Sequence, residues 1–136
     1  MANSSYDSMP VLVVDDQEIV RDLVTVMLRQ VGFRRIATAS DGGAAIKQIA
    51  QEAPCLIICD INMEPMNGLE FVAQLQAAGM IGKDRIPTIF MTGHAEEAKV
   101  KAAIKLGIDA FVVKPVKVGP LKQKIEAVLK RFGRIA

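Results

Sequence analysis

Four largely apolar runs of the sequence each end in a residue capable of ionic or hydroxyl chemistry. Asp15 and Asp16 follow VLVV, Asp60 follows CLIIC, Thr92 follows IPTIFM and Lys114 follows AFVV. Alone, each residue has an ordinary explanation, because an aspartate after a strand often caps a helix and a threonine often lies in a turn. If the fold brings these four ends together, they predict one shared site.

Three carboxylates in one site require a cation. A pair of like charges 4 Å apart costs about 4 kcal/mol at an effective dielectric constant of 20. An open site with few carboxylates and several waters suits Mg²⁺ better than a Ca²⁺ cage or a zinc site, with Mn²⁺ as a substitute. Asp60 is then a candidate nucleophile, because an aspartate can accept a phosphoryl group while Mg²⁺ and Lys114 neutralise its charge.

The elements that must position these residues follow from hydrophobic periodicity. Short β-branched runs alternate with longer stretches of helical period, which predicts five strand–helix units. Strands are expected at 11–15, 35–39, 55–60, 86–92 and 109–114, and helices at about 17–30, 42–52, 67–78, 95–106 and 118–132. In the first helix the predicted sheet-facing side consists of Ile19, Leu23, Val26, Met27 and Val31, and Gly32 is expected to end the helix.

The predicted fold class is α/β, a doubly wound five-stranded parallel sheet. The first, third and fourth strands are nearly all apolar, which is typical of strands covered by helices on both faces. Right-handed crossovers and the common order 2-1-3-4-5, a flavodoxin-like (βα)5 arrangement, make the first and third strands neighbours. The carboxyl ends of the strands, and with them the candidate site residues, would then meet at one edge.

Length and composition favour one cytoplasmic domain. The chain has 136 residues, 51% of them hydrophobic, and a net charge of +2. No apolar stretch reaches the roughly 20 residues of a membrane span, and no signal peptide is apparent, so membrane insertion is not expected. Cys55 and Cys59 are expected in the core. Residues 1–9 are expected to form a flexible tail and residues 10–136 the domain.

From Val11 to about Phe132 the sequence resembles the receiver domain of two-component response regulators. The resemblance implies that Asp15 and Asp16 bind Mg²⁺ and that Asp60 accepts a phosphoryl group from a histidine kinase or a histidine phosphotransfer protein. It also implies that the backbone carbonyl of Asn62 binds the metal. Such a protein is not a conventional enzyme, although it catalyses its own Mg²⁺-dependent phosphorylation and dephosphorylation.

The same resemblance implies a conformational switch. Thr92 and Lys114 would bind the new phosphoryl group, each through a charge-assisted hydrogen bond of roughly 1.5 to 3 kcal/mol. Phe111 would fill the space that Thr92 leaves, changing the surface of the fourth helix, fifth strand and fifth helix for a downstream protein. The peptide bond between Lys114 and Pro115 matches one that is frequently cis in the family. Asn62 and His94 would tune hydrolysis.

Some features depart from the family pattern or favour other partners. Glu64, followed by Pro65, stands where receivers commonly have proline, and Phe111 lacks the hydroxyl of a tyrosine. The last two expected helices are rich in lysine, which suits an acidic protein partner or a solvated face. No recognition motif accompanies this charge, so nucleic acid is not expected as a partner.

Two other functions compete with the receiver hypothesis. A small phosphohydrolase of the haloacid dehalogenase type also uses a strand-end aspartate and Mg²⁺, but its nucleophile follows the first strand and its general acid stands where this chain has Asn62. A receiver-shaped binding module without phosphorylation would have no need of three mutually repelling carboxylates. A stand-alone receiver is expected, because the sequence ends a few residues after the fifth expected helix.

Overall fold

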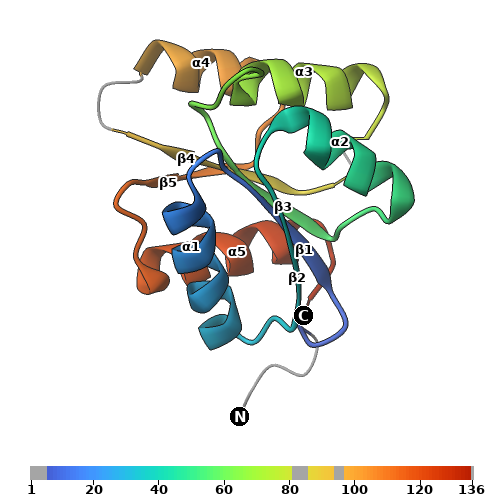
Figure 1. Cartoon of the computed structure of the whole chain (residues 1–136). Helices are drawn as coiled ribbons and strands as arrows, with labels where there is room; N and C mark the ends of the chain where they lie inside the picture. The colour runs from blue at the N-terminus through green and yellow to red at the C-terminus, as the bar shows by residue number, and fades with distance from the viewer. Residues whose placement is uncertain (1–5, 81–85, 94–96, 136) are drawn as a thin grey trace.

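The computed structural model describes residues 6–80, 86–93 and 97–135 (Figure 1). The strands are β1 (Pro10–Val14), β2 (Arg35–Ala39), β3 (Leu56–Asp60), β4 (Thr88–Thr92) and β5 (Ala110–Val113). The helices are α1 (Glu18–Val31), α2 (Gly42–Gln51), α3 (Gly68–Ala77), α4 (Glu97–Lys105) and α5 (Val118–Arg131). Every predicted strand and helix is present, and the described ends lie within two residues of those predicted.

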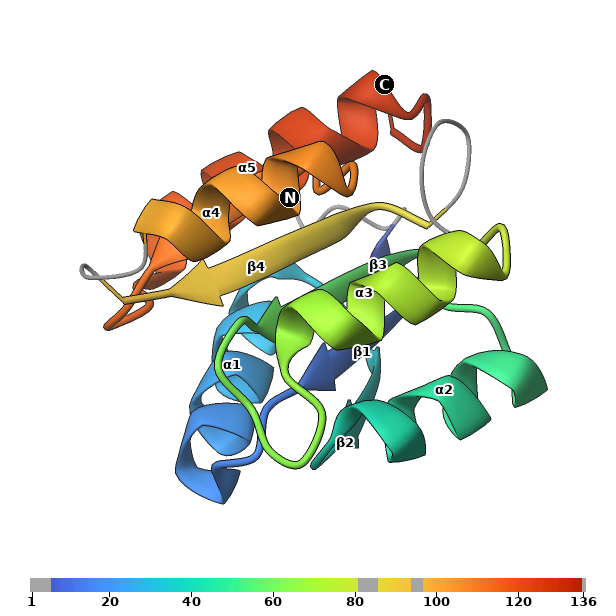
Figure 2. The same cartoon turned by 90° about the horizontal axis from the view of Figure 1, so that it is seen from above.

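The strands form one parallel sheet in the order β2-β1-β3-β4-β5, which confirms the predicted fold class. Helices α1 and α5 cover one face, and α2, α3 and α4 cover the other (Figures 1 and 2). β1 serves both layers, since Val11 and Val13 pack with α1 and α5 whereas Leu12 and Val14 pack on the opposite side. The central strands are therefore buried on both faces, as their apolar sequences predict.

Helix α1 buries only part of the predicted face, since Met27 and Val31 pack against the core but Ile19, Leu23 and Val26 do not. Ile19, Leu23 and Val26 are 77%, 49% and 53% exposed. The buried residues are Val24, Leu28 and Val31, with Val20 and Met27 packed beside them. The helix carries two apolar stripes at helical spacing, and periodicity alone does not decide between them. Gly32 ends the helix as predicted, at φ 127°.

The segment from Tyr6 to Met9 packs on the domain, which corrects part of the predicted tail. Tyr6 is fully buried and its ring stacks on Phe33 with a centroid distance of 4.6 Å. Met9 is also buried. Residues 1–5 lie outside the described part of the chain. No helix in that described part is long and apolar enough to span a membrane.

The hydroxyl of Tyr6 is buried without a hydrogen-bond partner among the described residues. We therefore expect Tyr6→Phe to leave the free energy of unfolding unchanged within about 0.5 kcal/mol or to raise it, because an unpaired buried polar atom is removed. Tyr6→Leu should lower it by about 1 to 2 kcal/mol, through loss of ring stacking and packing. Urea unfolding of both variants tests this, and a strongly destabilised Tyr6→Phe would contradict it.

Candidate functional site

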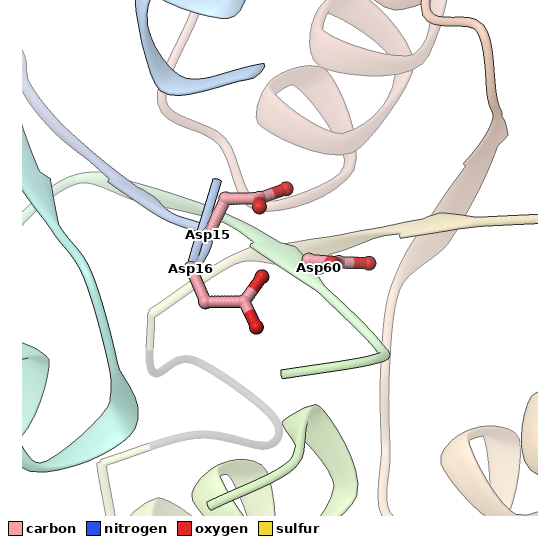
Figure 3. A group of neighbouring side chains, drawn as sticks. All are labelled: Asp15, Asp16 and Asp60. Carbon is pink, nitrogen blue, oxygen red and sulfur yellow. The ribbon is translucent and has the colours of Figure 1, made fainter. Parts of the chain in front are cut away.

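Three carboxylates gather at the carboxyl ends of β1 and β3. Val14 pairs with Cys59 across these strands, so Asp15 and Asp60 end neighbouring strands. One oxygen each of Asp15, Asp16 and Asp60 lies within 4.8 Å of the others, and their side chains are directed to the same side (Figure 3). Asp15 and Asp60 are buried, whereas Asp16 is exposed. The sheet edge thus assembles the predicted carboxylate cluster.

Lys114, which follows β5, supplies positive charge to this cluster. Its Nζ lies 3.0 Å from Asp60 Oδ1 and 3.6 Å from Asp15 Oδ2. Asp60 Oδ1 also accepts a hydrogen bond of 3.2 Å from the backbone N–H of Asn62. Asp15 Oδ1 accepts one of 2.8 Å from Gln17 N, but the buried Oδ2 has no hydrogen-bond partner in the described chain.

The electrostatic balance leaves the cluster short of positive charge. Burial raises the pKa of both Asp15 and Asp60, and the neighbouring Lys114 opposes this rise without cancelling it. For Lys114, burial lowers the pKa, but hydrogen bonding and charge attraction from Asp60 and Asp15 outweigh burial and raise it. Among the described residues, the Lys114 ammonium therefore pairs with two of the three carboxylates, Asp60 and Asp15.

The donor set fits a hard divalent cation. Its ligand atoms are carboxylate oxygens, and the buried Asp15 Oδ2 has no hydrogen-bond partner in the described chain, with Lys114 Nζ 3.6 Å away. Cys59 does not belong to this set, because its thiol donates to the backbone carbonyl of Asp60 at 3.3 Å. Burial also raises the pKa of that thiol well above its ordinary value. Cys59 is a core residue, as predicted.

The ends of β4 and β5 bring the hydroxyl and the ammonium to the same edge. Thr92 is buried, pairs with Val113 across the strands, and donates its Oγ1 hydrogen to Gly93 O at 3.2 Å. The backbone N–H of Lys114 donates to Thr92 O at 2.8 Å, which joins the two strand ends. The peptide bond between Lys114 and Pro115 is cis, in agreement with the resemblance.

The remaining predicted residues are Phe111, Asn62, Glu64 and His94, and the structure describes the first three. Phe111 is half-buried on β5, with its ring 6.4 Å from that of Phe90. Asn62 is exposed in the loop after β3, and the exposed Glu64 in the same loop precedes a cis peptide bond to Pro65. His94 lies outside the described residues, so its predicted role stays a prediction.

Comparison with known proteins decides the family. A family model described as the response regulator receiver domain matches residues 11–126. The chain belongs to this family. The probable chemotaxis protein CheY of Rhizobium etli is 33% identical over 132 residues, which cover 97% of this chain and 98% of that protein. The chemotaxis protein CheY of Pseudomonas aeruginosa is 29% identical over 125 residues, covering 92% and 99%.

Solved structures agree with this assignment. The receiver domain of NtrX from Brucella abortus is 30% identical, with a TM-score of 0.79 over 88% of this chain and 98% of that one. The protein is thus a phosphoryl-accepting switch of two-component signalling, and its acidic cluster fits the site of phosphorylation. Family membership also decides against the haloacid dehalogenase alternative.

Sequence reasoning missed three contacts of the receiver site. Arg21 donates from its guanidinium to the backbone carbonyl of Asp15 at 2.8 Å. Lys99 of α4 donates to the side-chain oxygen of Asn62. Gly68 at the start of α3 packs against the backbone at Asp60. Only Gly68 carried a sequence signal, because the Asn-Gly pair marks a tight turn before a helix.

Proposed function

We propose that Asp60 is the phosphoryl acceptor of this receiver domain. The observation that carries the proposal is the asymmetry of its carboxylate. Lys114 and the backbone N–H of Asn62 both contact Oδ1. Oδ2 is then the oxygen that bonds to phosphorus, while the bond between phosphorus and the donor's imidazole nitrogen breaks. Lys114 holds the acceptor carboxylate in place and lies within reach of the incoming charge.

Asp15, Asp16 and Asp60 would hold Mg²⁺, together with the backbone carbonyl of Asn62. When bound, the ion neutralises charge on the transferring phosphoryl group. Mn²⁺ has a similar preference for oxygen ligands and is the expected substitute. Two observations support this assignment: Oδ2 of Asp15 is buried without a hydrogen-bond partner in the described chain, and burial raises the pKa of both Asp15 and Asp60, so a bound cation would stabilise their charged forms.

The donor would be a histidine kinase or a histidine phosphotransfer protein, and the protein would act in the cytoplasm.

The output would be a change at the α4-β5-α5 surface that alters affinity for a downstream protein. A phosphoryl dianion on Asp60 would attract the Thr92 hydroxyl. The Phe111 side chain would then fill the space that Thr92 leaves. Two features support this surface as the output: Ile104, Val113 and Val118 are exposed on it, and a pocket of about 410 Å³ lies along β5 and α5.

Intact-protein mass spectrometry with acetyl phosphate tests the acceptor. We expect a Mg²⁺-dependent gain of about 80 Da, which one phosphoryl group on an aspartate adds. Asp60→Asn should abolish the gain, whereas Asp22→Asn, at an exposed position of α1, should retain it. An adduct that persists in Asp60→Asn would show that another residue accepts the phosphoryl group. Rapid consumption of donor without an adduct would favour hydrolase chemistry, and neither adduct nor Mg²⁺ binding would favour a binding module.

A further inference from the structure

A hydrogen bond joins helix α4 to the loop that carries the acceptor. Lys99, in the first turn of α4, donates from Nζ to the side-chain oxygen of Asn62. Asn62 in turn donates its backbone N–H to Asp60 Oδ1 at 3.2 Å. Lys99, Asn62 and Asp60 therefore form a continuous chain of contacts from the helix to the acceptor carboxylate.

The choice of partner by Lys99 is informative. A pocket of about 750 Å³ beside the site is lined by Asp16, Glu64, Glu70, Asn62 and Lys99, among others. Lys99 is the only basic residue of that lining within the described chain. Its described partner is nevertheless the neutral amide of Asn62 and not one of the carboxylates that line the pocket. Attraction between opposite charges therefore does not account for the position of the Lys99 side chain. The effect of this hydrogen bond is to fix the position of the Asn62 side chain.

Helix α4 offers few other contacts that could hold this region in place. Ala103 is its only buried residue in the described part of the helix. The side chain of Asn62 is likewise exposed, and its described hydrogen bond is the one from Lys99. Without that donor the amide would rotate freely in solvent, because an exposed side chain gains entropy when it is released.

We propose that Lys99 is a positioning residue that holds the Asn62 side chain at the pocket that Asp16 also lines, and thereby slows hydrolysis of the acyl phosphate. This inference rests on the proposed role of Asp60. In hydrolysis, a water oxygen bonds to phosphorus as the bond to Asp60 breaks. Inorganic phosphate leaves, the water's protons pass to phosphate and solvent, and the carboxylate is regenerated. An Asn62 amide held at this pocket restricts the approach of that water from the pocket side.

The test is a double-mutant cycle on the lifetime of the acyl phosphate. The protein is phosphorylated with acetyl phosphate and Mg²⁺, the donor is removed, and loss of the adduct is followed by intact mass. Lys99→Met should speed the loss by about threefold to tenfold, the size expected when one positioning hydrogen bond is removed. Asn62→Ala should have a similar effect, and the double variant should be no faster than the faster single variant.

Two control variants separate positioning from a general effect of charge or helix stability. Lys101→Met removes an exposed lysine from the same helix and should leave the rate unchanged. Lys99→Arg retains a cationic donor and should keep the rate near that of the wild type. Additive effects in the double variant, or a Lys99→Met rate equal to that of Lys101→Met, would overturn the inference.

A second measurement requires no phosphorylation. The side-chain NH₂ signal of Asn62 in a ¹⁵N–¹H spectrum, assigned by its loss in Asn62→Ala, should shift in Lys99→Met and not in Lys101→Met. An unmoved signal would refute the contact itself. If the wild type forms no adduct, the proposed function fails and the inference fails with it. A normal adduct with unchanged hydrolysis refutes the inference alone.

Discussion

Gly68→Ala is expected to lower the free energy of unfolding by about 3 kcal/mol, the range of substitutions that force backbone shifts in a packed interior. A Cβ at this buried position would lie 2.6 Å from the carbonyl oxygen of Asp60 and 2.8 Å from the Cα of Ile61. Both are backbone atoms, which cannot rotate away as a flexible side chain can. The backbone N–H of Gly68 also donates to Ile61 O at 3.0 Å, so the start of helix α3 is held against the end of strand β3 here.

The same substitution should slow the proposed phosphorylation of Asp60, since relief of the clash displaces the Asp60 backbone from the cluster. Gly119→Ala is the matched control, because no described atom beyond its two chain neighbours lies within 4 Å of the added Cβ and the residue belongs to α5. It should change the free energy of unfolding by no more than about 1 kcal/mol, because the helix propensity of alanine is offset by the cost of a Cβ on the residue before Pro120. Urea unfolding at equal m values measures both changes. A Gly68→Ala protein as stable as the wild type would refute the close contact.

The assembly of the carboxylate cluster was predictable because it depends on topology rather than on side-chain conformation. A parallel sheet of known order brings the ends of neighbouring strands together, and a charged residue after each apolar run is visible in the sequence. The observed pairing of Val14 with Cys59 and of Thr92 with Val113 places Asp15 beside Asp60 and Thr92 beside Lys114, as that order requires. Prediction of this part of the site needed no atomic detail.

The contacts that were missed depend on details beyond periodicity. Lys99 is a long side chain on a partly exposed helix turn, and its partner depends on the path of the loop after β3. The buried stripe of α1 could not be chosen from spacing, because Leu23 and Val24 belong to rival apolar faces of one helix. Burial of Tyr6 depends on its fit against Phe33, 27 positions later in the sequence.

Asp15→Asn is expected to have opposite effects on stability and on metal binding. Burial raises the pKa of Asp15, which means that the fold disfavours its charged form. The amide can keep the hydrogen bond from Gln17 while it removes repulsion from Asp60. We therefore expect the metal-free variant to gain roughly 1 kcal/mol in free energy of unfolding, because relief of the buried charge and of its repulsion by Asp60 outweighs loss of the 3.6 Å ion pair with Lys114.

Its affinity for Mg²⁺ should fall by at least about tenfold, because one of three carboxylates is lost from the proposed cation site. Thermal unfolding with EDTA and across a Mg²⁺ titration measures both effects, since a ligand that binds only the folded state raises Tm with concentration. Asp22→Asn, at an exposed position of α1, should change neither. A variant destabilised in EDTA, or one that Mg²⁺ stabilises as strongly as the wild type, would contradict the charge deficit. The opposite signs follow from one cause: the same uncompensated charge that weakens the metal-free fold supplies the attraction for the cation.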